Sequence, residues 1–241
     1  MNEKQANTVN RLKGHIIEYY DPQMIILYGS TARGDTDEFS DIDFMVIMDV
    51  PDYEKAAEKL LSETDHILYD KHITIKSTAD YYNQRDIPGT MVYSAMSEGM
   101  ILYRSSNFDS DTLPQKSYEE RKRYVIQREY IEQIKDFMNM AKSARISKKV
   151  YRCRDYLRFS VARTLKAVLV FRDIHPPRSI DLKILYEMAV ERFPGIDKFY
   201  PFIEELDGYH PKGNISYDVV ECKELACKTT LFVDSIASFF K

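Results

Sequence analysis

The chain has 241 residues, of which 44% are hydrophobic and 30% charged, with 8 Gly and 9 Pro. This composition is typical of a globular protein and excludes collagen, low-complexity disorder and a coiled-coil rod. No apolar run approaches the roughly 20 residues that a membrane span needs, and the polar N-terminal stretch is unlike a secretory signal, so we expect a cytoplasmic protein without membrane contact. Cys153, Cys222 and Cys227 lack CxxC spacing, so buried free thiols are expected rather than disulfides or a zinc site.

The charge is unevenly distributed along the chain. Residues 1–110 carry 10 Lys/Arg and 19 Asp/Glu, whereas residues 111–241 carry 24 and 19. The segment 116–178 alone holds 17 basic and 7 acidic residues. Such asymmetry between halves indicates two units with different roles.

The first unit alternates strands and helices. After an N-terminal helix, short apolar runs predict strands at 24–28 and 42–48 with a polar loop between them. Helical spacing follows over 52–62, then strand character over 66–76, a further helix, and a last strand at 99–103. We therefore predict an α+β fold whose N-terminal domain, 1–104, is a mixed sheet with flanking helices.

The polar stretch 104–116 is rich in turn formers and predicts a domain boundary. Beyond it the apolar spacing is helical. Helices are expected around Ile134 to Ala141, around Leu157 to Leu169, and over 181–192, 197–206 and 217–240. Four or five helices with short connections predict an all-α bundle over 117–241.

The candidate phosphate-binding and metal-binding residues lie where the first predicted strand ends and the second begins. Gly29-Ser30 ends the first strand, and ten residues later Asp41-Ile42-Asp43 begins the second. Because a strand alternates faces, Asp41 and Asp43 share one side, and their repulsion is relieved by a divalent cation such as Mg²⁺ or Mn²⁺. Gly29 permits close backbone approach, while Ser30 offers a hydroxyl and an amide to a phosphate. Phosphate and metal held side by side favour transfer of a nucleotidyl group.

The string GSTARGDTDEFSDIDFMVI resembles the G-S-x(10)-D-x-D pattern of the DNA polymerase β-like nucleotidyltransferase superfamily, specifically its minimal nucleotidyltransferase (MNT) branch. The resemblance covers about residues 8–104. It implies that Gly29 and Ser30 bind the triphosphate and that Asp41 and Asp43 hold the metals. Arg33 is a further candidate for phosphate binding, with an ion pair to Asp35 or Asp37 as the alternative.

The family also implies a third carboxylate on a later strand, which shares a metal and accepts the proton of the attacking hydroxyl. Asp70 and His72 both lie on the expected face of that strand. We assign Asp70 to the third metal-binding and catalytic position, but alignment of the following apolar residues places His72 there. If His72 holds the position, the alternative is a domain that binds nucleotide with little chemistry.

The helical half has its own resemblance. The segments 156–170 and 176–182 are similar to the HEPN domain, a bundle often fused to MNT domains, and to the C-terminal bundle of aminoglycoside nucleotidyltransferases. HEPN ribonucleases resemble one another in an Arg followed four to six residues later by His, and this pattern is missing, because His175 follows Arg172 by only three residues and His210 has no Arg shortly before it. We therefore expect no ribonuclease activity from this half.

Together these features predict a Mg²⁺-dependent enzyme that transfers NMP from a nucleoside triphosphate to a hydroxyl acceptor and releases pyrophosphate. A small molecule, a protein Tyr and an RNA end are all open as acceptors, and a homo-oligomer is compatible with the sequence. The alternative is a non-catalytic nucleotide-binding or toxin-antitoxin-derived module.

Overall fold

A computed structural model describes residues 3–35, 41–67, 69–193, 195–207 and 219–240. The chain divides into two compact units, Met1–Ser117 and Tyr118–Lys241. The division falls at the C-terminal end of the polar stretch for which we predicted a boundary. Among the described residues, no helix is both long and apolar enough to cross a membrane.

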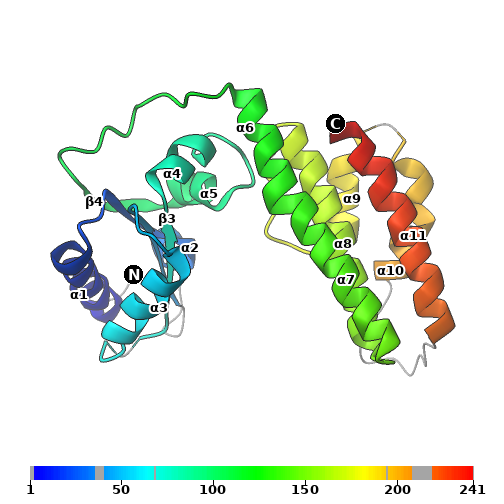
Figure 1. The fold of residues 1–241 in the computed structure, drawn as a ribbon, viewed down its shortest axis with the longest axis horizontal. Coiled ribbons are helices and arrows are strands. Elements are labelled where there is room, and N and C mark those ends of the chain that lie inside the picture. Colours follow the sequence, from blue (N-terminus) through cyan, green and yellow to red (C-terminus); the bar gives the residue numbers. More distant parts are fainter. Residues whose placement is uncertain (1–2, 36–40, 68, 194, 208–218, 241) are drawn as a thin grey trace. The chain divides into compact units, whose positions relative to one another are not determined.

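The first unit is built on a four-stranded sheet in the order β3-β2-β1-β4 (Figure 1). Its strands are β1 (Met24–Tyr28), β2 (Ile42–Ile47), β3 (Lys71–Lys76) and β4 (Met100–Arg104). Strand β1 pairs antiparallel with β2 and with β4, whereas β2 and β3 run parallel. The predicted mixed sheet is confirmed. The third strand begins five residues later than expected, because the chain turns after α3, with the Ile67 amide donating to the Thr64 carbonyl at 2.9 Å.

Helices cover both faces of this sheet. They are α1 (Glu3–Tyr20), α2 (Gly29–Arg33), α3 (Tyr53–Glu63), α4 (Thr78–Gln84) and α5 (Met91–Glu98). Phe44 of β2 packs in one core cluster with Leu12 of α1 and Leu60 of α3. Met45, which points to the opposite face, packs with Tyr81 of α4 and Val92 of α5. The loop expected after β1 contains the short helix α2, and two helices rather than one precede β4.

The polar stretch after β4 belongs structurally to the first unit. Phe108 is buried in the cluster under α4 and α5. Tyr82 Oη donates to the Asp109 carbonyl at 2.8 Å, and an Arg85 guanidinium nitrogen donates to the Thr112 carbonyl at 2.9 Å. A stretch without periodicity therefore packs on the sheet domain through one aromatic side chain and its own backbone carbonyls.

The second unit is helical throughout its regular structure, as predicted. Its elements are α6 (Tyr118–Val125), the π-helical segment η1 (Ile126–Ile131), α7 (Glu132–Ile146), α8 (Val150–Phe171), α9 (Leu182–Val190), η2 (Asp197–Phe199), α10 (Tyr200–Asp207), α11 (Val219–Ala237) and η3 (Ser238–Phe240). Helix α8 lies at the centre, with Leu157, Val161, Leu165 and Val168 fully buried. The expected start of the last helix, at 217, lies outside the described residues.

Several cations of this unit serve its own packing. Arg154 of α8 is 2% exposed and donates to the carbonyls of Glu205 and Leu206. Arg158, one turn later, pairs with Asp207 at 2.8 Å. These arginines tie α8 to the C-terminal end of α10. A helix with arginines on two faces thus uses at least two of them structurally.

A second polar cluster joins α6 to the end of α8. Lys122, 3% exposed, donates to both carboxylate oxygens of Asp173 at 3.0 and 3.1 Å, and Tyr118 Oη donates to the same carboxylate. Burial would raise the pKa of Asp173, but the hydrogen bonds from Tyr118 and Lys122 outweigh it and hold this pKa below its ordinary value. Asp173 has φ +58°, so these bonds also hold a strained backbone position.

The three thiols are free, as expected, but they differ in exposure. Cys153 of α8 and Cys222 of α11 are buried, whereas Cys227 is exposed. The expectation that all three are buried is wrong for Cys227, which lies on the outer face of α11. Burial raises the pKa of Cys153 to about 12.

Candidate nucleotidyl-transfer site

The pairing of β1 with β2 brings the predicted phosphate-binding and metal-binding residues to one edge of the sheet. The two strands are antiparallel, with Tyr28 opposite Asp43. The chain leaves β1 into Gly29 and Ser30 at the same edge at which Asp41 leads into β2. Ser30 and Asp41, which ten residues separate in the sequence, are therefore brought to the same end of the sheet, as the predicted pattern requires.

Gly29 and Asp43 are in direct contact. Gly29 has φ +76°, and a Cβ placed on it would lie 2.2 Å from Asp43 Oδ2 and 3.1 Å from Asp43 Cγ. An L side chain here would displace the Asp43 carboxylate, because real Cβ atoms essentially never approach within 3.0 Å of a neighbour. The Asp43 side chain is 25% exposed, so one side of the carboxylate rests on the Gly29 backbone while part of it faces solvent.

Thr31 fixes the position of Asp41. Its hydroxyl donates to the Asp41 carbonyl at 2.9 Å, and the residue is 3% exposed. This bond closes the loop between β1 and β2, of which residues 36–40 lie outside the described part. The Asp41 side chain is exposed beside this anchored backbone. Sequence analysis missed Thr31, because a threonine in a polar loop carries no signal of burial.

The parallel pairing of β2 with β3 decides which residue stands opposite Asp43. The register places His72 there, with His72 Nδ1 3.6 Å from Asp43 Oδ1. Asp70 precedes β3, is exposed, and accepts a backbone hydrogen bond from Ile42 at 2.9 Å through its carbonyl. In the described part of the chain, no three His, Cys, Asp or Glu residues converge as a metal site. The assignment of Asp70 as third metal ligand therefore stays a prediction.

Arg33, the last residue of α2, is held by two carboxylates. Its Nε lies 3.0 Å from Asp35 Oδ2, and its Nη1 lies 3.0 Å from Glu98 Oε2 at the end of α5. The ion pair with Asp35 is the alternative that the sequence left open. Phosphate binding by Arg33 stays a prediction, and it requires the guanidinium to share its donors with these carboxylates.

A less polar surface continues from Asp43 along the same face of the sheet. Tyr28 Oη lies 3.4 Å from Thr74 Oγ1 and 3.9 Å from the Met91 sulfur. Met91 opens α5 and is 41% exposed. An aromatic ring, a hydroxyl and a thioether thus lie beside the carboxylates.

Comparison with known proteins agrees with this geometry. The family model described as "Polymerase beta, Nucleotidyltransferase" matches residues 10–108, which include β1, α2, β2 and β3. No curated protein sequence matches the chain.

Among solved structures, the chain is similar to spectinomycin adenyltransferase AAD(9) from Enterococcus faecialis, which was crystallised with ATP and spectinomycin. The two share 16% sequence identity over 98% of this chain and 100% of that chain, with a TM-score of 0.51. A nucleotidyltransferase-like protein from Exiguobacterium sibiricum 255-15 gives a weaker likeness, with 10% identity, coverage of 98% and 74%, and a TM-score of 0.39. The likeness to the HEPN domain stays a prediction. Residues 10–108 thus match a nucleotidyltransferase domain of the polymerase β type, and the whole chain shares its fold with AAD(9).

Proposed function

We propose that the protein is a Mg²⁺-dependent nucleotidyltransferase that transfers NMP from a nucleoside triphosphate to a hydroxyl acceptor. The observation that carries the proposal is the contact between the Asp43 carboxylate and the Gly29 backbone, at the edge where Asp41 and Ser30 also lie. This contact restricts the sequence, since a side chain at position 29 would displace the Asp43 carboxylate. A close approach of this kind is expected where a carboxylate and a bound phosphate must share one metal ion.

The donor atoms at this edge suit the metal. Asp41 and Asp43 supply hard carboxylate oxygens, and Mg²⁺ is commonly bound by one or two carboxylates together with substrate phosphates. When bound, Mg²⁺ or Mn²⁺ would neutralise charge on the triphosphate and on the leaving pyrophosphate. Asp41 and Asp43 would hold it, while the amide and hydroxyl of Ser30 bind phosphate oxygens.

The reaction exchanges one bond at phosphorus for another. The acceptor hydroxyl oxygen bonds to the α-phosphorus, and the bond between this phosphorus and the β-phosphate oxygen breaks, which releases pyrophosphate. The hydroxyl proton must pass to a base, for which Asp70, just before β3, is our candidate. The proposed acceptor is a hydroxylated small molecule, with a protein Tyr or an RNA end as the other options, and ATP is the first donor to test because AAD(9) was crystallised with it.

Calorimetry with Mg-ATP, followed by pyrophosphate release over a panel of acceptors, tests the proposal. Asp41→Asn or Asp43→Asn should abolish metal-dependent binding or turnover, with the melting temperature unchanged or raised because carboxylate repulsion is relieved. Asp65→Asn, which removes an exposed carboxylate from the turn after α3, is the matched control and should behave as the wild type. Normal turnover by both site variants would refute the assignment.

One observation favours a second function, nucleotide binding without transfer. His72 rather than a carboxylate stands opposite Asp43, and a neutral imidazole is a poor ligand for a hard cation. Binding of Mg-ATP without pyrophosphate release, in the wild type and in Asp70→Asn alike, would support this function. His72→Glu, which places a carboxylate in that register position, should then give measurable release.

A further inference from the structure

The turn between α7 and α8 holds two helix ends tightly together. Only three residues separate the helices, and all three donate their amides back into α7. The Ser147 amide bonds the Ser143 carbonyl at 3.0 Å, the Lys148 amide bonds the Arg145 carbonyl at 3.0 Å, and the Lys149 amide bonds the Ala144 carbonyl at 2.8 Å. The last turn of α7 and the first turn of α8 therefore form one surface.

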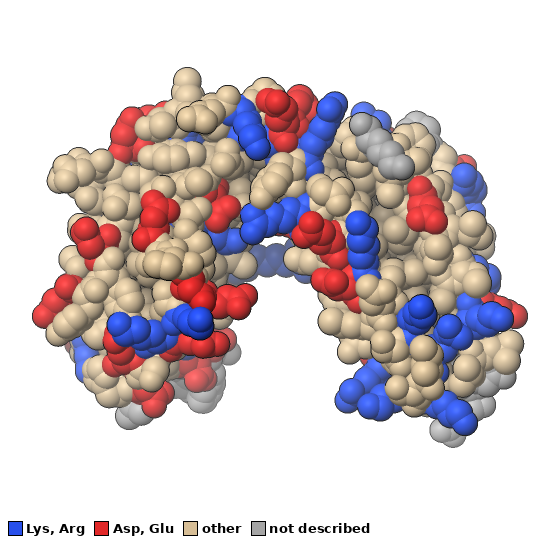
Figure 2. Space-filling view, in the orientation of Figure 1, with Lys and Arg blue, Asp and Glu red and all other residues tan. Residues whose placement is uncertain are grey.

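This surface is strongly basic. We name as the basic turn the four exposed cations between residues 142 and 152, which are Lys142, Lys148, Lys149 and Arg152. Arg145, the fifth cation of this stretch, is half-buried and acts electrostatically on the buried thiols of Cys153 and Cys222. No acidic residue occurs between Asp136 and Asp155. Within the described residues none of the four forms an ion pair, whereas Lys122, Arg158 and Lys228 of the same unit each pair with a carboxylate. Figure 2 shows Lys and Arg side chains gathered over this end of α7 and α8.

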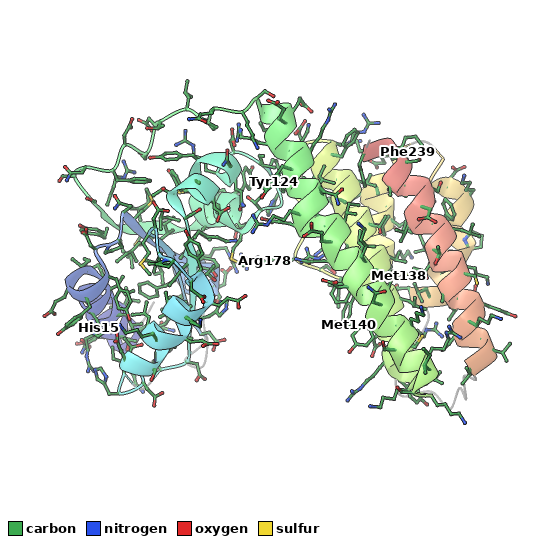
Figure 3. All side chains as sticks on the ribbon, viewed as in Figure 1. His15, Tyr124, Met138, Met140, Arg178 and Phe239 are labelled. Carbon is green, nitrogen blue, oxygen red and sulfur yellow. The ribbon has the colours of Figure 1, made fainter. Side chains whose placement is uncertain are left out.

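A hollow of about 330 Å³ opens beside the basic turn. Its walls include Met140, Ser143, Ser147, Lys149, Arg152 and Tyr156. Met140, labelled in Figure 3, marks its place near the end of α7. The hollow is shallow and open to solvent, and it combines two serine hydroxyls, two cations and one tyrosine ring.

The backbone conformation of Lys148, in the middle of the turn, is unusual for a lysine. It has φ +55°, a left-handed conformation that glycine or asparagine adopts at less cost than lysine. A cation is thus present where the backbone favours an uncharged residue. Strained positions of this kind often occur at functional sites.

We propose that the basic turn binds single-stranded nucleic acid, with the backbone phosphates on its cations and one base in the hollow against Tyr156. Four exposed cations exceed what a single phosphate group needs, so the complementary ligand is a polyanion. Cations beside an aromatic ring are typical of surfaces that bind single strands, because stacking on the ring requires an unpaired base. An acidic polypeptide offers the charge but no planar base for the hollow. The proposal goes beyond the proposed function and does not depend on Asp41 or Asp43.

The test is fluorescence anisotropy on the full chain with labelled 12-mers of oligo-U and oligo-dT, and with a 12-base-pair duplex. Both single strands should bind more tightly than the duplex. Lys148→Asn/Lys149→Gln should weaken binding about tenfold and make the salt dependence of log K shallower by about 1 to 1.5, since each phosphate contact on a single strand contributes about 0.7. Asparagine suits the left-handed position, so this variant should keep its fold.

Two further pairs of variants make the result specific. Lys183→Gln/Lys198→Gln removes the same charge from exposed positions on α9 and η2 and should bind as the wild type. Tyr156→Phe should bind normally, while Tyr156→Leu should lose about tenfold in affinity through lost stacking. Equal losses in the two lysine pairs, equal binding of the duplex, or equal competition by poly-glutamate would each overturn the proposal.

Discussion

Replacing Gly29 by alanine tests the contact on which the proposed function depends. The new Cβ would lie 2.2 Å from Asp43 Oδ2, and contacts below 3.0 Å are essentially never observed. The carboxylate must therefore move by about 1 Å, several times the ~0.2 Å within which metal–ligand distances are held. The left-handed backbone at φ +76° adds a cost of about 1–2 kcal/mol to folding.

Gly34→Ala separates these two effects. Gly34 has φ +82°, and a Cβ added there would meet no neighbouring atom within 4 Å. Alanine at this position incurs the same backbone cost of about 1–2 kcal/mol without displacing a carboxylate. Both variants incur this backbone cost, and only Gly29→Ala also displaces Asp43, so the difference between them in function reports the position of this carboxylate.

Calorimetric titration with Mg-ATP and thermal unfolding give the two readouts. Gly29→Ala should bind Mg-ATP about 10- to 100-fold more weakly than the wild type, the loss typical of disturbed support around a metal ligand. Gly34→Ala should retain wild-type affinity. If the two variants bind Mg-ATP equally, the Gly29–Asp43 contact does not position a metal ligand and the reasoning fails.

Three further predictions concern stability and thiol reactivity. Gly14→Ala, at an exposed position inside α1 with open space for a Cβ, should raise the free energy of unfolding by about 0.5–1 kcal/mol in denaturant titrations. Asp173→Asn should cost about 1–2 kcal/mol at pH 7, because Lys122 loses a partner. The depressed pKa of Asp173 stabilises the fold above the ordinary pKa of an aspartate and stops doing so as the pH falls through the folded-state value, so a pH series should show a flatter acid limb for this variant, and an unchanged limb would contradict the assignment. Titration with a thiol reagent at pH 8 should show fast modification of Cys227 alone, since Cys153 and Cys222 are buried and burial raises the pKa of both; a fast thiol remaining in Cys227→Ser would refute this.

The strands and the pattern of the site were predictable because both depend on local sequence. An apolar run and its alternation place Phe44 in the core and Asp43 on the other face, whichever strands pair with β2. The features that depend on contacts between separate segments were harder to predict from the sequence. The choice between Asp70 and His72 rests on a register that a shift of one residue would alter. The Thr31 hydrogen bond joins residues ten positions apart, and single-residue chemistry gives no sign of it.

The cations in the basic half of the chain fall into two groups with different roles. Arg154, Arg158 and Lys122 stabilise the fold, because each is buried or half-buried and bonded to a carbonyl or carboxylate of another segment. Removing any of them leaves a polar partner without its bond, so their substitution should affect stability first. The basic turn has the opposite character, since its cations repel one another and lack carboxylate partners among the described residues. A protein gains no stability from such a cluster, so its presence is better explained by an anionic ligand than by folding.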